Sequence, residues 1–174
     1  IGHPILGDSR YGSNAVNRMI DSTLRDVHFV AMNTDLQALD ASRATVRIPL
    51  GTQTTGGLGA GGDPSVGEKA ALEDKDTIKK LLEGSDMVFV TAGMGGGTGT
   101  GAAPVIASVA RDMGILCVAV VTKPFALEGK RKAELADEGI RKLREHVDTL
   151  ITIPNQNLLR IVQKNTPMKQ ALLY

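Results

Sequence analysis

Four short, almost unbroken apolar runs recur along this chain and constrain its fold more than any other feature. They occupy residues 29–32, 87–90, 116–121 and 150–153. Runs of this length without polar alternation are typical of strands that are covered on both faces of a sheet. The stretch 46–50 instead alternates and contains a proline, so it predicts an edge strand.

Between these runs the apolar residues recur with the period of a helix. One stripe lies at residues 16–24, and another at residues 105–113 ends before Gly114. Residues 130–146 carry opposite charges four positions apart, which is typical of a solvated helix face. This alternation predicts an α/β fold with three layers, in which a mostly parallel, Rossmann-like sheet is flanked by helices. We expect the ligand in the loops that follow the strands.

The charge and hydropathy of the chain argue against several classes of partner. Its 20 basic and 19 acidic residues almost cancel, so it has no broad positive field to attract nucleic acid. Its apolar runs fall far short of the roughly 20 residues that a membrane helix needs. The one cysteine, Cys117, cannot form an internal disulfide, and the first residues lack the pattern of a secretory leader. We therefore expect a cytoplasmic protein that binds no nucleic acid and does not insert directly into a membrane.

The strongest functional motif is the loop Gly-Gly-Gly-Thr-Gly-Thr-Gly at residues 95–101, between a predicted strand and a predicted helix. Its glycines allow several N–H groups to converge on one anion, and the positive end of the following helix adds to the attraction. Thr98 and Thr100 add hydroxyl donors. The expected guest is a phosphate group. Because the loop lacks a Walker lysine and does not open the first strand-helix unit, backbone dipoles and a metal ion must meet the charge.

A second glycine loop at residues 56–62 precedes Asp63 and Pro64, and it offers another wall for the same ligand. We expect Asp63 to cap the following helix, the alternative being contact with a metal ion through water. The polar run 33–35 directly follows a strand. Residues in such a place touch a ligand or cap a helix, and the sequence leaves both interpretations open.

Several blocks of the sequence, in order, resemble the FtsZ family of tubulin-related GTPases. They lie at residues 14–19, 33–35, 57–62, 87–104, 121–125, 128–129, 146–150 and 153–155. The glycine-threonine loop is the motif that FtsZ and the tubulins share. The resemblance implies a GTP-binding GTPase that assembles head to tail into filaments and acts in cytokinesis at the division site, with other division-site proteins as partners.

The resemblance also assigns roles by position. Gly97, Thr98 and Gly99 would hold phosphate, Glu128 would contact the ribose, and Lys132 stands where the family has an arginine. The cofactors would be GTP or GDP, with Mg²⁺ held mainly by phosphates and water because it dehydrates reluctantly. Together with the loops described above, the expected nucleotide-binding residues are Gly12, Ser13, Asn14, Asn33, Gly61, Gly62, Gly95, Gly96, Gly97, Thr98, Gly99, Pro124, Glu128 and Lys132.

No catalytic residue is expected within this chain. In the family the attacking water is positioned by an acidic loop of the neighbouring subunit, and that loop would follow Tyr174. The first phosphate loop also departs from the family's glycine run, because residues 7–14 include Asp8 and other side chains that would crowd a phosphate. We therefore expect impaired activity, and the alternative is a non-catalytic module that caps or joins filaments. A dehydrogenase is disfavoured, since the acidic residue that should follow a dinucleotide motif is missing.

The N-terminal segment is a further departure. Pro4 argues against a central strand at residues 1–6 because it cannot donate a ladder hydrogen bond. Residues 2–12 weakly resemble a segment of the RluA-type pseudouridine synthases, which favours a fused or exchanged segment. We expect an atypical segment at residues 1–11, followed at residues 12–174 by an FtsZ-like GTP-binding domain without the C-terminal part of the family.

Overall fold

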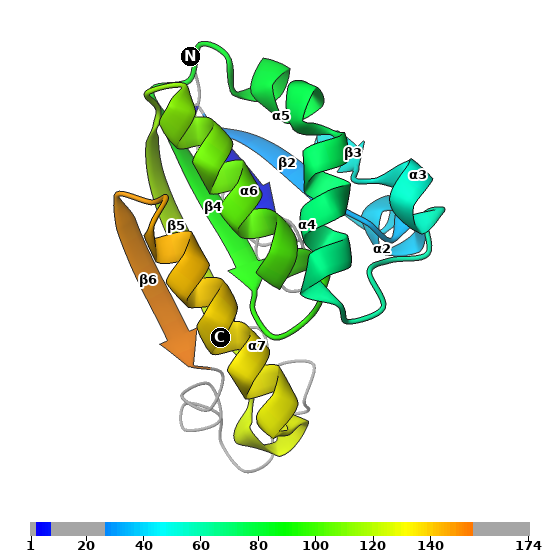
Figure 1. Ribbon diagram of the computed structural model, residues 1–174. Helices are drawn as coiled ribbons and strands as arrows, with labels where there is room; N and C mark the ends of the chain where they lie inside the picture. The colour runs from blue at the N-terminus through cyan, green and yellow to red at the C-terminus, as the bar shows by residue number, and fades with distance from the viewer. Residues whose placement is uncertain (1–2, 8–26, 155–174) are drawn as a thin grey trace, which may run out of the picture.

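The computed structural model describes residues 3–7, as backbone only, and residues 27–154. Within these ranges one sheet has the strand order β3-β2-β1-β4-β5-β6, and each neighbouring pair is parallel (Figure 1). The strands are β1 (His3–Gly7), β2 (Val27–Asn33), β3 (Val46–Pro49), β4 (Met87–Gly93), β5 (Leu116–Lys123) and β6 (Thr149–Pro154). The helices are α2 (Leu36–Asp40), α3 (Thr52–Thr55), α4 (Pro64–Glu73), α5 (Lys75–Leu82), α6 (Thr98–Asp112), the 3₁₀ turn η1 (Ala126–Glu128) and α7 (Lys130–Arg144).

The strand order confirms the α/β fold predicted from the sequence. The four apolar runs lie in β2, β4, β5 and β6, and the proline-containing stretch forms β3 at the edge of the sheet. Crossovers between parallel strands are right-handed, so the direction in which the chain moves along the sheet decides which face a helix covers. Helices α4 to α7 accompany moves toward β6 and share one face, whereas α2 accompanies the move from β2 to β3 and lies on the other.

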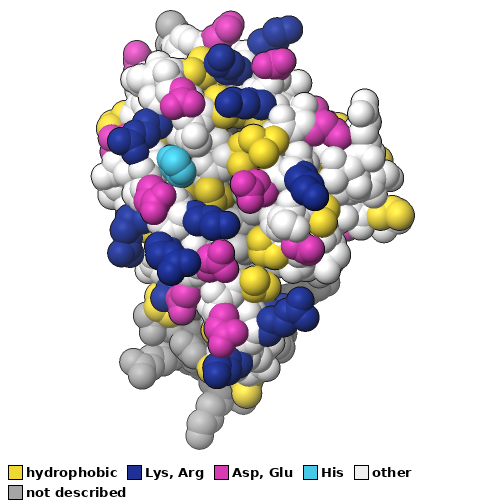
Figure 2. All heavy atoms as spheres, viewed as in Figure 1, with side chains coloured by type: hydrophobic (Ala, Val, Ile, Leu, Met, Phe, Trp, Pro, Cys, Tyr) yellow, Lys and Arg dark blue, Asp and Glu magenta, His cyan; other side chains and the backbone are white. Residues whose placement is uncertain are grey.

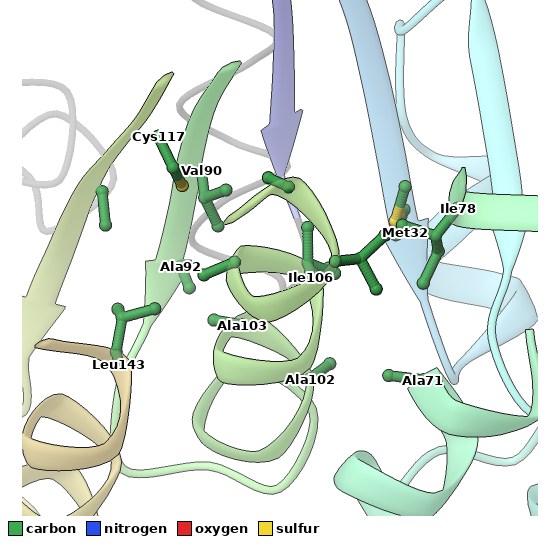
Figure 3. Close-up of a cluster of buried hydrophobic side chains, with 14 of the residues drawn as sticks. Met32, Ala71, Ile78, Val90, Ala92, Ala102, Ala103, Ile106, Cys117 and Leu143 are labelled. Atoms are coloured by element: carbon green, nitrogen blue, oxygen red, sulfur yellow. The ribbon is translucent and has the colours of Figure 1, made fainter. Parts of the chain in front are cut away.

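The larger core lies between the sheet and helices α4 to α7. Helix α6 packs against α4, α5 and α7 and also against β4 and β5. Figure 3 shows Ile78 of α5, Ile106 of α6 and Leu143 of α7 gathered in this core, and all three are fully buried. Burial of one such side chain contributes roughly 1.5–3 kcal/mol relative to exposure. This packing fixes α6, whose first residues border the cavity described below.

A smaller core on the opposite face completes the layers. The side chains of β2 alternate, so that Val30 and Met32 join the larger core while Phe29 and Ala31 join the smaller one. Leu39 of α2 packs against this second pair. The sheet is therefore covered from both sides at β2, as the unbroken apolar run predicted.

Strand β1 lies at the centre of the sheet, so the argument from Pro4 was wrong. Pro4 pairs with His28 of β2, whereas pairing with β4 begins one residue later, between Ile5 and Phe89. Pro4 thus precedes the part of β1 that is paired on both sides, and its missing N–H does not interrupt the ladder to β4. His3–Gly7 supplies the central strand that the sequence left unassigned.

Helix α6 begins at Thr98, inside the glycine-threonine loop and well before the apolar stripe at residues 105–113. Gly114 follows the helix with a φ of 71°, the left-handed conformation that commonly ends helices. The loop and the helix are therefore one continuous unit. The stripe expected as a helix at residues 16–24 lies outside the described residues.

Helix α7 has the charged face that the sequence predicted. Lys130 lies 3.7 Å from Glu134, and Lys142 lies 3.5 Å from Glu138. Such exposed pairs stabilise a helix by only a few tenths of a kcal/mol, roughly 0.3–0.5 each. Across the span 27–154, no helix combines the length and apolar character that a membrane crossing requires.

Strand β6 is aligned with β5 by a reciprocal pair of hydrogen bonds. The Cys117 N–H donates to Asp148 Oδ2 at 2.8 Å, and the Asp148 N–H donates to the Cys117 carbonyl at 2.9 Å. Burial, together with the nearby Asp148 carboxylate, raises the pKa of the Cys117 thiol to about 12. The thiol is therefore a packing group rather than a nucleophile.

Candidate functional site

Three strands end around one cavity of about 320 Å³. Its walls come from the residues that follow β2, β4 and β5 and from the second glycine loop. This edge, beyond the carboxyl ends of parallel strands, is where such sheets bind ligands. The expected nucleotide-binding residues that line the cavity are Asn33, Gly61, Gly95, Gly96, Gly97, Thr98, Gly99, Pro124, Glu128 and Lys132.

Among the expected residues that the structure describes, one lies outside this wall. Gly62 does not line the cavity, because the chain turns there into the cap of α4. Gly12, Ser13 and Asn14 lie outside the described residues.

The glycine-threonine loop is held firmly to the sheet. The Met94 N–H donates to the Thr122 carbonyl of β5 at 2.9 Å, and the Gly95 N–H donates to Thr100 Oγ1 at 2.9 Å. Gly95 has a φ of 106°, which a residue with a side chain rarely adopts. The expectation that Thr100 offers its hydroxyl to the ligand was wrong, because this side chain is buried and braces the loop from inside.

The first turn of α6 directs backbone donors toward the cavity. The first hydrogen bond of the helix runs from the Gly101 N–H to the Gly97 carbonyl at 3.1 Å. The N–H groups of Thr98, Gly99 and Thr100 precede it and have no partner within the helix. Together with the helix dipole, they make this end of the cavity attractive to an anion.

The polar run after β2 both caps a helix and lines the cavity. Asp35 Oδ1 accepts the N–H groups of Gln37 and Ala38 at 2.9 and 3.3 Å, so Asp35 is the cap of α2. The Asn33 side chain accepts the Asp35 N–H at 3.1 Å. Thr34, between them, is buried, and its hydroxyl lies 2.6 Å from that of Thr98. The helix cap is therefore confirmed, and contact of this run with a ligand stays a prediction that its place at the cavity favours.

The second glycine loop joins the same wall. Its Gly59 N–H donates to the Thr34 carbonyl at 3.0 Å. Asp63 caps α4 as predicted, since its Oδ1 accepts both the N–H and the hydroxyl of Ser65 at 2.8 Å. These bonds hold the pKa of the Asp63 carboxyl below its usual value of 3.8.

Glu128 and Lys132 lie side by side on the opposite rim. Glu128 Oε2 accepts the Phe125 N–H at 2.7 Å, and Lys132 Nζ lies 3.4 Å from Glu128 Oε1. The carboxylate thus braces η1, of which Glu128 is the last residue, and Glu128 also lines the cavity. Pro124 also lines this rim and lies close to Gly95.

Four residues that line the cavity had no ligand role in the sequence analysis: Ala38, Gly93, Met94 and Thr122. Thr122 is the first polar residue after the apolar run of β5, and that change of character was a usable signal. Leu58 of the second glycine loop is 88% exposed, and its position between glycines in the sequence does not indicate this exposure.

A metal ion would find few protein ligands here. In the part of the chain that the structure describes, no three His, Cys, Asp or Glu side chains cluster closely enough to hold one. The carboxylates at the cavity, Asp35 and Glu128, are both engaged by backbone N–H groups. A cation at this place would therefore depend on ligands that the nucleotide and water bring.

A larger cleft of about 470 Å³ lies between α4, α6 and α7. It is lined by carboxylates and amines together, among them Glu68, Glu138, Lys75 and Lys142. Acidic and basic side chains intermingle over this whole face (Figure 2). Because the cleft lies away from the strand ends and its three glutamates, Glu68, Glu138 and Glu145, outnumber its two lysines, it is the weaker candidate for an anion site.

The chain that forms this cavity is similar to known proteins of one family. The model of the Tubulin/FtsZ family, GTPase domain, matches residues 10–163. The chain is 54% identical to the cell division protein FtsZ of Pseudomonas putida over 167 residues, 96% of this chain and 42% of that protein. It is 55% identical to the protein of the same name from Coxiella burnetii, again over 96% of this chain and 43% of the relative.

Solved structures of known proteins include one that is similar to this chain in both sequence and fold. An FtsZ dimer from M. jannaschii superposes with a TM-score of 0.93 at 45% identity, over 99% of this chain and 50% of that one. The chain thus spans less than half the length of the two curated relatives. It belongs to the tubulin/FtsZ family, and residues 10–163 match the GTPase domain of that family.

Proposed function

We propose that this chain binds GTP and GDP in the cavity at the ends of β2, β4 and β5. The observation that carries the proposal is the loop at residues 95–99, whose backbone N–H groups lead into the first turn of α6 beside the cavity. A nucleotide tail carries several negative charges, and a helix N-terminus preceded by glycines suits it.

The roles of the other residues follow from their places around the cavity. Thr98 donates its hydroxyl to a phosphate, and Asn33 and Gly61 bound the opposite wall. Glu128 contacts the ribose of the bound nucleotide through its carboxylate. Lys132, which lies beside that carboxylate, adds positive charge. Mg²⁺ is coordinated by the phosphates and water. Gly12, Ser13, Asn14 and Gly62 complete the proposed set.

We further propose that the chain is part of a filament-forming protein that acts at the division site in the cytoplasm. Two of its relatives are named cell division proteins, and the M. jannaschii FtsZ was solved as a dimer.

Hydrolysis requires an acidic loop from the next subunit, and in the family that loop would follow Tyr174. We therefore propose that the 174-residue chain, tested by itself, turns over GTP negligibly even where its copies associate. Phosphate release should then stay flat as the chain concentration rises, and turnover that rises with concentration would contradict this part of the proposal.

The alternative function is a non-catalytic module that caps or joins filaments without nucleotide. The side chains in the first loop, Asp8 among them, favour it, since they would crowd a phosphate. Release of GDP from the purified, heat-denatured chain separates the two functions. We expect bound or readily added GDP, whereas a chain that never binds it would favour the module.

Titration calorimetry with GDP and with a slowly hydrolysed GTP analogue tests the binding site. Thr98→Val should weaken binding by more than about tenfold, because a hydrogen bond to a charged group is lost. Gly99→Val should abolish binding by filling the space next to the phosphates. Thr54→Val is the matched control, since the Thr54 hydroxyl bonds Glu73 on the exterior. Wild-type affinity in both site variants would refute the proposed site.

A further inference from the structure

Thr34 is a buried residue whose contacts reach both glycine loops. Its side chain is 1% exposed, and its Oγ1 lies 2.6 Å from Thr98 Oγ1. Its carbonyl accepts the Gly59 N–H at 3.0 Å and the Thr55 hydroxyl at 3.3 Å. One residue therefore joins the start of α6 to the second glycine loop.

The shared hydrogen bond between the two hydroxyls has one proton and two possible donors. Within residues 27–154, the hydrogen-bond partner of Thr34 Oγ1 is Thr98 Oγ1. A buried hydroxyl whose proton lacks an acceptor costs free energy, so the Thr34 proton belongs in this bond. Thr98 then acts as the acceptor, and its own proton stays free.

The direction of this bond matters for an anionic ligand. Thr98 is only partly buried and borders the cavity, so its free proton can turn toward a phosphate oxygen. In the reverse arrangement Thr98 would present lone pairs to the phosphate, and like partial charges would repel. The Thr34 hydroxyl thus selects the arrangement that binds.

We propose that Thr34 is a positioning residue, which donates to Thr98 Oγ1 and thereby fixes the Thr98 hydroxyl as a donor toward the nucleotide phosphates. This inference rests on the proposed nucleotide site and adds to it a residue whose hydroxyl acts through Thr98. It also predicts that the Thr34 hydroxyl, rather than its shape, is what binding requires.

Calorimetric titration of the 174-residue chain with GDP tests the inference through three variants. Thr34→Val keeps the shape but removes the proton, and we expect GDP affinity to fall about tenfold. Thr34→Ser keeps the hydroxyl and should restore affinity to within about threefold of wild type. Thr54→Val, on the exterior of the second loop, should bind as the wild type does.

A second readout shows whether the valine variant keeps its fold. The Gly59 N–H reports the bond to the Thr34 carbonyl. In the absence of nucleotide, the Gly59 amide resonance of the Thr34→Val variant should therefore match that of the Thr34→Ser variant. Weak binding with an unmoved Gly59 signal supports positioning by the hydroxyl.

The outcomes separate this inference from the function on which it rests. If the wild type binds GDP and Thr34→Val binds equally well, the positioning role is wrong and the site stands. If Thr34→Ser loses as much affinity as Thr34→Val, or if the Gly59 resonance shifts in the valine variant alone, packing is the cause and the inference fails. If the wild type does not bind guanine nucleotide, the proposed function falls first.

Discussion

The loops at residues 95–101 and 56–62 are similarly rich in glycine and border the same cavity, yet they need glycine for different reasons. Gly101 lies in α6, where an added Cβ would come within 2.0 Å of the Pro64 carbonyl of α4. Gly61 has a φ of 61°, but an added Cβ would meet no heavy atom within 4 Å. In the first loop Gly97 and Gly101 serve close packing and Gly95 alone has a positive φ, whereas all five glycines of the second loop have a positive φ.

The difference shows how the site is built. Close contact between α4 and α6 fixes the position of the phosphate loop, because the loop runs directly into α6. The second loop is shaped by its own backbone and then tied to Thr34. We therefore expect the packed loop to respond to substitution through stability and the second loop to respond far less.

The largest effect is expected at the contact between the helices. Gly101→Ala forces a Cβ against the backbone of α4, which cannot move aside as a flexible side chain could. We expect a loss of at least about 3 kcal/mol in the free energy of unfolding, measured by urea denaturation.

Gly96→Ala is the matched control within the same loop. Gly96 is exposed and has open space where a Cβ would be placed, so its unfolding free energy should change by less than about 0.5 kcal/mol. Equal urea midpoints for Gly101→Ala and wild type would remove the packing explanation.

The second loop should show a smaller effect. Gly61→Ala places a side chain in the left-handed region without a clash, and we expect it to cost about 1 kcal/mol in unfolding free energy. Gly61→Asn should cost less, since asparagine tolerates this conformation better. A loss as large as that of Gly101→Ala would erase the distinction between the loops.

The sequence predicted the parallel sheet, its edge strand and the place of the cavity, because each rests on local pattern and on the general topology of α/β folds. It did not predict that Thr100 braces the loop or that Gly101 packs on α4, since both depend on contacts between segments distant in the chain. Pro4 misled because the effect of a proline depends on register, and register follows from the assembled sheet.

The smallest effect concerns the cap between the second loop and α4. The pKa of Asp63 is depressed by its bonds to Ser65. The charged carboxylate therefore stabilises the folded chain at pH values above 3.8, the usual pKa of the group. That contribution is lost as the pH falls through the lower, folded-state pKa. Asp63→Asn keeps the cap without the charge.

The difference in melting temperature between wild type and Asp63→Asn tests this directly. We expect the wild type to melt slightly higher at neutral pH and the gap to close as the pH falls below 3.8 and through the lowered pKa of Asp63. A gap that widens in acid would mean that the charge opposes folding.

The central claim is that the backbone N–H groups of residues 96–99 face the phosphates of a guanine nucleotide, while the Gly95 N–H bonds Thr100 inside the loop. Titration of ¹⁵N-labelled chain with GDP, followed by two-dimensional NMR, tests it most directly. We predict saturable shifts of the Gly96, Gly97, Thr98 and Gly99 amides, with little change at Gly84, which lies away from the cavity. Saturating GDP that leaves the amide resonances of residues 96–99 unmoved would contradict this claim.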